Sequence, residues 1–294
     1  MNNEFIKEIK NVNNDILELN KSLKHFNTLK LESSCKYLIM PTSFVELKKI
    51  FIIIKKYNVK YIVIGNGSNI VLSPKEKDCV IKLNFITSKY DCIFYASDML
   101  MIKANEFYNK GYMGLEYLAN IPASIGGAIL MNAGAYSHFL SDIIEYVYFI
   151  DEDYNFKVLD NKSCGFGYRD SIFKNDNKII LGCKVSTKKG NKSDIRKIMD
   201  ECKEKRKESQ PIEFPNCGSV FKNKENISAW KLIEGASLKG YKRNGAMISR
   251  KHCNFIINYN NATYEDVLFL ILLIKKKVNK AFKINLEEEV IIIE

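Results

Sequence analysis

The amino-acid sequence predicts an α+β protein made of two or three compact units. Its 294 residues reach the size at which a single hydrophobic core stops growing, roughly 250 to 300 residues. Stretches of helical periodicity alternate with short β-rich runs that end at glycine turns. A charged helical stretch stops near Pro211, and we expect a domain boundary there.

The first third of the chain begins this alternation. Apolar residues between positions 4 and 22 recur at roughly helical spacing and predict one amphipathic helix. Residues 43–57 follow a Thr-Ser cap and predict a second helix. Residues 60–64 form a β-rich run that stops at Gly65, which indicates a strand followed by a turn.

The same patterns predict the remaining elements. Further strands are expected at residues 79–83, 146–150, 178–185, 253–257 and 290–293. Further helices are expected at residues 193–208, 229–238 and 264–282.

The composition excludes a membrane protein and selects no function by itself. The longest apolar run, residues 267–274, is far below the roughly 18 residues that cross a bilayer. The N-terminus has no signal-peptide features, so we expect a cytoplasmic protein. Eight scattered cysteines without a Cys-x-x-Cys pair indicate free thiols and no metal site.

The net charge of +11 leaves two readings open. Lysines are spread along the chain and alternate with glutamates in residues 201–208, which is typical of a solvated surface. A basic field also favours nucleotides and other polyanions. A non-catalytic nucleic-acid-binding protein is an alternative, but no aromatic-interleaved basic stripe supports it.

A Gly-x-Gly turn directly follows the strand at residues 60–64. Such a turn presents backbone N–H groups to an anion, because glycine permits positive φ and close approach. It lacks the third glycine of a Rossmann fingerprint and the Gly-Lys-Ser/Thr of a P-loop; an ordinary hairpin turn is the alternative. The residues of this loop are Gly65, Asn66, Gly67, Ser68 and Asn69.

A second segment, residues 114–136, is rich in glycine, alanine and asparagine. So many small side chains let the backbone lie against a large planar ligand, or against another helix. The segment includes Pro122, Ser124, Ile125, Gly126, Gly127, Asn132 and Gly134.

Three further motifs carry polar groups. Arg169, between Tyr168 and Asp170, looks buried, and an arginine of this kind is usually an ion-pair anchor. Residues 218–223 are expected to form a strand with three polar side chains on one face; these are Ser219, Lys222 and Asn223. Glu289 belongs to a carboxylate cluster at the start of the last strand, and such clusters are usually exposed. His252 is expected to be structural.

In order and spacing, these motifs resemble the family of UDP-N-acetylenolpyruvoylglucosamine reductases. The resemblance covers about residues 20–294 and also rests on the Asn27-Thr28 pair and on residues 251–258. The chain departs from the family pattern at three places. Ala123 stands where glycine is usual, residues 32–34 replace Ile-Gly-Gly, and Lys224 stands where proline is typical.

The resemblance implies a two-domain FAD-binding module of the vanillyl-alcohol-oxidase (PCMH) type plus a smaller α+β substrate-binding domain. We place the first FAD-binding subdomain at residues 1–85 with 286–294, the second at residues 86–207, and the substrate-binding domain at residues 208–285. The connection at residues 186–193 is too short for the tyrosine-bearing lid loop that some members carry, and it contains no tyrosine. We therefore expect the shorter type.

The resemblance also assigns roles. The Gly65 to Asn69 loop would hold the pyrophosphate of non-covalently bound FAD, and the Pro122 to Gly134 segment would line the flavin. Arg169, Ser219 and Glu289 match catalytic positions, whereas Tyr168, Lys222 and Asn223 would bind substrate. The implied reaction reduces the enolpyruvyl ether of a UDP-amino sugar with NADPH as co-substrate, in a monomeric enzyme. Another FAD-dependent oxidoreductase of the same superfamily is the alternative.

Overall fold

A computed structural model describes residues 2–86, 89–174, 178–224 and 227–294. The chain divides into two compact units, each described here by itself. Unit 1 comprises Met1–Lys21, Cys35–Asn66 and Lys77–Lys203. Unit 2 comprises Ser22–Ser34, Gly67–Glu76 and Glu204–Glu294. The three-part division expected from the family stays a prediction.

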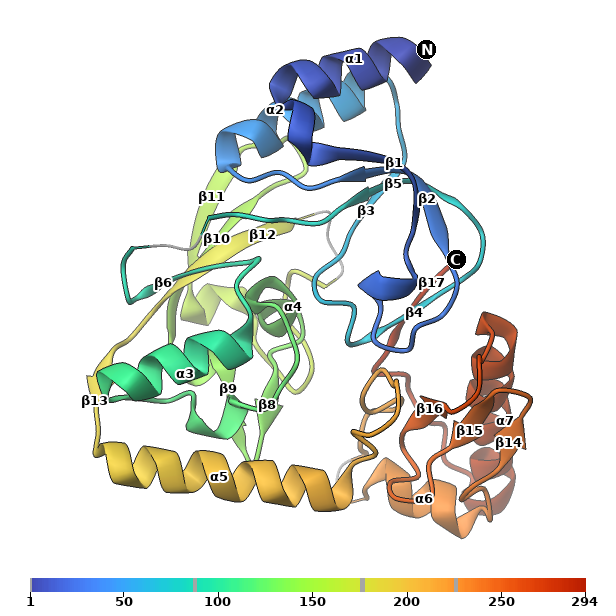
Figure 1. Cartoon of the computed structure of the whole chain (residues 1–294). Coiled ribbons are helices and arrows are strands. Elements are labelled where there is room, and N and C mark those ends of the chain that lie inside the picture. The colour runs from blue at the N-terminus through green and yellow to red at the C-terminus, as the bar shows by residue number, and fades with distance from the viewer. Residues whose placement is uncertain (1, 87–88, 175–177, 225–226) are drawn as a thin grey trace. The chain divides into compact units, whose positions relative to one another are not determined.

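The first sheet of unit 1 carries two helices on one face, where α1 packs against α2 (Figure 1). Strand β5 pairs in parallel with β2 and with β3, so that Cys79 stands opposite both Tyr37 and Tyr61. The sheet order is β1-β2-β5-β3. These elements are α1 (Asn2–Val12), β1 (Leu17–Ser22), β2 (Ser34–Ile39), α2 (Phe44–Lys56), β3 (Tyr61–Val63) and β5 (Lys77–Ile81).

The predicted single helix over residues 4–22 is wrong in its second half. Helix α1 ends at Val12, a short 3-10 helix follows at Asn14–Ile16, and β1 takes the remaining residues. The side chain of Asn13 accepts a hydrogen bond from the backbone N of Asp15 at 3.0 Å. Polar side chains of this kind compete with helical hydrogen bonds and favour caps and turns, which ends the helix.

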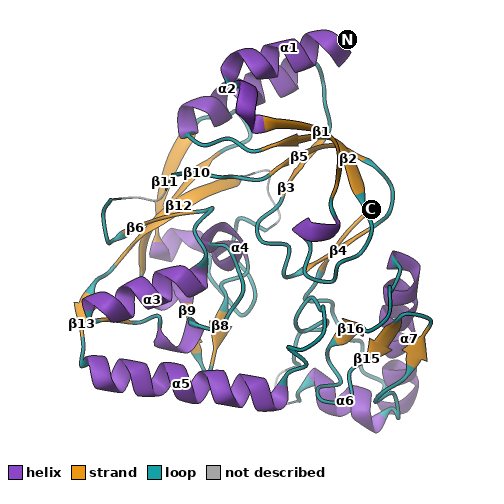
Figure 2. Ribbon diagram, viewed as in Figure 1, coloured by secondary structure: helices purple, strands orange, loops and turns teal. Residues whose placement is uncertain are grey.

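The second sheet of unit 1 is antiparallel, in the order β11-β10-β12-β6. Figure 2 shows these strands in orange and the helices in purple. Its strands are β6 (Ile93–Tyr95), β10 (Ile144–Ile150), β11 (Phe156–Asp160) and β12 (Ile179–Val185). Associated helices are α3 (Leu100–Lys110), α4 (Ile125–Leu130) and α5 (Lys192–Ser209). Two small pairs complete the unit: β7 (Tyr112–Met113) with β13 (Lys188–Lys189), and β8 (Gly134–Ala135) with β9 (His138–Phe139).

Unit 2 has its own hydrophobic core, to which helix α7 contributes a row of buried residues from Val267 to Val278. Thr263 forms a capping box with Asp266 at the start of that helix. The helix therefore begins at the predicted residue, Tyr264. Helix α7 contacts α6 and the antiparallel sheet β14-β15-β16 (Figure 1). The elements are β4 (Ile70–Leu72), α6 (Ala229–Gly235), β14 (Lys242–Arg243), β15 (Ala246–Ile248), β16 (Ile256–Asn258), α7 (Tyr264–Phe282) and β17 (Ile291–Ile293).

Two strand predictions in unit 2 need correction. The strand expected at residues 253–257 is displaced to Ile256–Asn258, because the Ser249 hydroxyl accepts bonds from the backbone N of Lys251 and of His252 and forms a turn there. Residues 218–223 form no regular strand. They carry only the isolated bridge between Phe221 and Glu288.

The eight cysteines are free thiols, as predicted, and seven of them are buried. Across the described residues, no group of histidine, cysteine and acidic side chains could hold a metal ion. No helix within the same ranges is long and apolar enough to span a bilayer.

Candidate active site

The unit 1 half of the Gly-x-Gly loop lies against the second predicted flavin segment. The side-chain amide of Asn66 donates to the carbonyl of Pro122 at 2.7 Å. A Cβ added at Gly65 would lie 2.3 Å from Ser124 Oγ, far inside van der Waals contact. Glycine allows this close approach, and a side chain here would force Ser124 to move.

The turn before α3 holds the start of α4 in place through backbone atoms. Ile125 N donates to Asp98 O at 2.8 Å, and Gly126 N donates to Ala96 O at 2.9 Å. Ser124 caps α4 by accepting from Gly127 N at 3.3 Å. Ala123, where the family has glycine, is not among the residues with positive φ, so its methyl group adds no backbone strain.

The Tyr-Arg-Asp-Ser motif is tied to the same segment. Asn132 is buried and donates to Gly167 O at 3.0 Å while it accepts from Ser141 N. Arg169 donates from Nη2 to Gly134 O at 3.0 Å. Its guanidinium also lies 5.2 Å from the ring centre of Tyr168, within cation–π range. Two motifs that lie apart in the sequence therefore meet.

The loop residues that belong to unit 2 connect to the family's first motif. Gly67 has φ +68°, and an added Cβ would lie 2.1 Å from Phe26 O, so only glycine fits. Its carbonyl accepts from Thr28 N at 3.1 Å, and the Thr28 hydroxyl also donates to Asn216 O at 2.6 Å.

Three distant segments converge around Glu289 in unit 2. The side-chain amide of Asn69 donates to Glu289 O at 3.0 Å, and Glu289 N donates to Val220 O at 2.8 Å. Val220 directly follows Ser219, so these bonds bring together the backbone beside Ser219, the backbone of Glu289 and the loop. Strand β17 continues it by pairing in parallel with β4.

Buried Asn254 makes the hydrogen bonds that a neighbouring strand would otherwise make to the backbone after Ser219. Its side chain accepts from Phe221 N at 3.0 Å and donates to Phe221 O at 2.8 Å, while its own carbonyl accepts from Val220 N. Sequence reasoning assigned no role to Asn254 beyond membership of a family motif. Its signal was a single asparagine inside an otherwise apolar run.

Lys222 and Asn223 have different partners. Lys222 forms an ion pair with Glu287, whereas the Asn223 side chain accepts from Ala229 N at 2.9 Å and so holds the start of α6. Consecutive residues of an extended chain point to opposite sides, so Lys222 and Asn223 do not share one face, and the expectation of three polar side chains on one face was wrong. The Lys224 N–H donates to Ile227 O at 3.1 Å, a bond that a proline there would lose.

His252 packs among aromatic side chains, and its buried Nδ1 has no hydrogen-bond partner among the described residues. Its ring lies 4.8 Å from that of Phe255 in an edge-on contact and 6.3 Å from that of Trp230. Burial lowers the pKa of His252, which favours the neutral imidazole.

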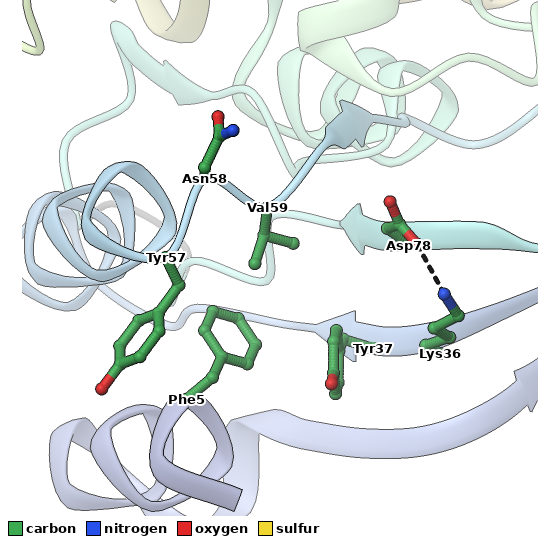
Figure 3. Close-up of a pocket in the computed structure, with 7 residues that line it drawn as sticks. All are labelled: Phe5, Lys36, Tyr37, Tyr57, Asn58, Val59 and Asp78. Carbon is green, nitrogen blue, oxygen red and sulfur yellow. Dashed lines mark hydrogen bonds and ion pairs between the residues drawn. The ribbon is translucent and has the colours of Figure 1, made fainter. Parts of the chain in front are cut away.

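One pocket of unit 1 is separate from these residues (Figure 3). It measures about 150 Å³ and contains none of the predicted site residues. Its two charged groups, Lys36 and Asp78, form a 2.8 Å ion pair and so neutralise each other. The lining residues are Phe5, Lys36, Tyr37, Tyr57, Asn58, Val59 and Asp78.

Comparison with known proteins shows the family. Residues 35–154 match the model of the FAD binding domain, and residues 210–293 match the model of the UDP-N-acetylenolpyruvoylglucosamine reductase C-terminal domain. A UDP-N-acetylenolpyruvoylglucosamine reductase from Caldanaerobacter subterraneus is 37% identical over 99% of this chain and 96% of its own length. The chain belongs to the UDP-N-acetylenolpyruvoylglucosamine reductase family.

Two further relatives agree. A reductase of the same name from Carboxydothermus hydrogenoformans is 40% identical over 96% of this chain and 95% of its own length. The crystal structure of the Thermus caldophilus enzyme superposes with a TM-score of 0.82 at 32% identity, and the match covers 95% of this chain and 99% of that one. The predicted family and the predicted FAD-binding fold class are thereby confirmed.

Proposed function

We propose that this protein catalyses the NADPH-dependent, FAD-mediated reduction of UDP-N-acetyl-3-O-(1-carboxyvinyl)-glucosamine to UDP-N-acetylmuramate, a step of peptidoglycan precursor synthesis. The observation that carries the proposal is the cluster in which Asn69 and Val220 both bond to the backbone of Glu289. It joins three of the family's motifs in a chain that matches the family along nearly its whole length.

The residues present fit FAD. Gly65 lets the loop lie close against Ser124, and the segment from Pro122 to Gly134 offers small side chains and a fixed backbone. FAD supplies the carrier that accepts a hydride from NADPH and delivers it to the substrate. We propose that the loop of Gly65, Asn66, Gly67, Ser68 and Asn69 holds its pyrophosphate. The flavin is lined by Pro122, Ser124, Ile125, Gly126, Gly127, Asn132 and Gly134.

Arg169 and Glu289 stabilise the negative charge that develops on the substrate during the reaction. A hydride adds to the β-carbon of the enol ether, and negative charge then accumulates on a carboxylate that is already anionic. Positive charge and hydrogen bonds fixed beforehand on this group lower the barrier, and such electrostatic effects are commonly the largest in an active site. Arg169 binds the carboxylate, and Glu289, protonated or bridging, polarises it.

Ser219 completes the reduction by donating its hydroxyl proton to the α-carbon. The carbanion left by hydride addition is strongly basic, so an ordinary hydroxyl suffices as general acid. Buried Asn254 fixes the backbone on the C-terminal side of Ser219, which limits the positions that the hydroxyl can reach. Tyr168, Lys222 and Asn223 bind the UDP-sugar.

Other parts of the proposal concern the state of the protein. It is a monomer of the cytoplasm that binds a UDP-sugar and no nucleic acid, with FAD held non-covalently. It belongs to the shorter type, because the connection between β12 and α5 spans only residues 186–191. This connection has no tyrosine to cover the substrate.

Anaerobic stopped-flow spectroscopy tests the function in two steps. The purified yellow protein is first mixed with NADPH, which should bleach the flavin absorbance. Mixing the bleached enzyme with the enolpyruvyl UDP-sugar should then restore the yellow colour and yield UDP-N-acetylmuramate in equal amount. Reoxidation by oxygen but not by the UDP-sugar would instead indicate another flavoprotein oxidoreductase.

A further inference from the structure

Lys82 is a cation of unit 1 to which the sequence patterns assigned no role. It follows β5, and its ammonium donates to the carbonyl of Gly65 at 2.8 Å. The side chain is partly buried. Burial lowers the pKa of Lys82, the direction expected when an ammonium loses water.

Lys82 differs from two other lysines of the unit, Lys103 and Lys36, which both have acidic partners. Lys103, which is only 4% exposed, pairs with Asp98 at 3.5 Å and with Glu106 at 3.0 Å. Lys36 pairs with Asp78 at the rim of the pocket in Figure 3. Among the described residues, no carboxylate lies within ion-pair distance of Lys82.

A partly buried ammonium without a counter-charge is unfavourable by itself. The Gly65 carbonyl satisfies one of its three donors, and a neutral side chain could make that bond as well. An anionic ligand would explain why the charge is there, because a charge-assisted bond from nitrogen to a phosphate oxygen is among the stronger hydrogen bonds.

The position of Lys82 indicates which anion. Gly65, its partner, lies against Ser124, and Asn66 bonds to Pro122. The ammonium therefore lies where the unit 1 residues of both predicted FAD segments meet. FAD carries a permanent negative charge only on its pyrophosphate. We propose that Lys82 binds the FAD pyrophosphate and makes the site selective for the dinucleotide over riboflavin, an inference that rests on the proposed function.

Flavin binding to the deflavinated protein tests this role without any turnover. The dissociation constants of FAD and of riboflavin are measured by quenching of flavin fluorescence in the wild type, Lys82→Met and Lys82→Arg. Lys82→Met should weaken FAD binding about 10- to 100-fold, the range for a hydrogen bond to a charged group, and leave riboflavin binding nearly unchanged. Lys82→Arg should stay close to wild type.

Lys36→Met is the matched control, because it removes a lysine of the same unit from a pocket without predicted flavin residues. It should change neither constant. Added salt should weaken FAD binding in the wild type more than in Lys82→Met.

Two outcomes would overturn the proposed role of Lys82, and a third would overturn the proposed function. Equal loss of FAD and riboflavin in Lys82→Met would mean that Lys82 only holds the Gly65 turn. Unchanged FAD affinity with a shifted redox potential would place the charge at the flavin ring. A wild-type protein that binds no flavin would contradict the proposed function instead.

Discussion

In unit 1 the predicted flavin residues meet through glycines and backbone atoms, whereas in unit 2 the predicted catalytic residues Ser219 and Glu289 lie on irregular chain held by side-chain amides. Gly65 approaches Ser124 so closely that no Cβ fits between them. Ser219 precedes two residues that Asn254 binds in place of a neighbouring strand.

This difference predicts how a substitution in each region should affect ligand binding and catalysis. An added atom in the flavin segments disturbs packing, so its effect is steric and reaches every ligand of the site. A removed functional group beside Asn254 leaves the backbone in place, so its effect is chemical and confined to one step. The predictions below test that distinction.

The largest effect is expected from Ser219→Ala, which removes the proposed general acid. Turnover of the enolpyruvyl substrate should fall roughly 10²-fold or more, the scale of general-acid catalysis. Reduction of the flavin by NADPH should continue at a near-normal rate, because no proton from Ser219 is needed for it. Stopped-flow spectroscopy measures the rates of both half-reactions in the wild type and in the variant, so flavin reduction serves as the control. An equal loss of rate in both half-reactions would assign Ser219 a structural role.

Gly65→Ala tests the steric side of the comparison. The new Cβ would lie 2.3 Å from Ser124 Oγ, and overpacking of this kind costs about 1–3 kcal/mol. We expect FAD and riboflavin to bind about 10- to 100-fold more weakly, as read by fluorescence quenching. This loss of both ligands contrasts with the selective loss expected for Lys82→Met.

The double variant Gly65→Ala/Ser124→Ala shows whether the clash is the cause. It removes the hydroxyl oxygen that the new methyl group would meet and should regain part of the flavin affinity. Gly167→Ala is the matched control, because its nearest neighbour would be Asp170 Cβ at an ordinary 3.7 Å. No recovery in the double variant would rule out the Ser124 contact as the source of the loss.

Local signals in the sequence predicted the regular elements well. Helix α7 matches its expected bounds of 264–282, because a capping residue and a long amphipathic pattern act together there. The turn at Gly65 was predicted for the same reason, since glycine, strand end and polar neighbours coincide. The prediction of one helix over residues 4–22 was wrong because it relied on the apolar spacing. In the structure the turn preference of Asn13 and Asp15 ends the helix instead.

The parts of the site that depend on distant partners left no local signal. Asn69 and Glu289 bond across 220 residues of sequence, and nothing in either neighbourhood reveals the other. The stretch from Gly218 to Asn223 reads as a strand, yet the amide of Asn254 supplies the bonds that a partner strand would give. In the sequence, Lys82 resembles any lysine after a strand, and only the structure shows that no described carboxylate pairs with it.

The smallest effect is expected from Lys222→Ala, which removes a cation proposed to bind the UDP diphosphate. One partly exposed lysine contributes only a few kcal/mol at most to binding an anion. The Michaelis constant for the UDP-sugar should therefore rise clearly, while kcat changes little. Stability should hardly change, because the partner Glu287 is 61% exposed and such surface ion pairs contribute about 0–1 kcal/mol.

Glu287→Gln separates the two roles that Lys222 could have. It removes the same ion pair but leaves the lysine charge, so substrate binding should be unchanged or tighter, because Lys222 no longer has to leave a competing carboxylate. Steady-state kinetics of both single variants and of the double variant decide the matter. If Glu287→Gln raises the Michaelis constant as much as Lys222→Ala does, the ion pair matters for local structure, and Lys222 does not bind the diphosphate.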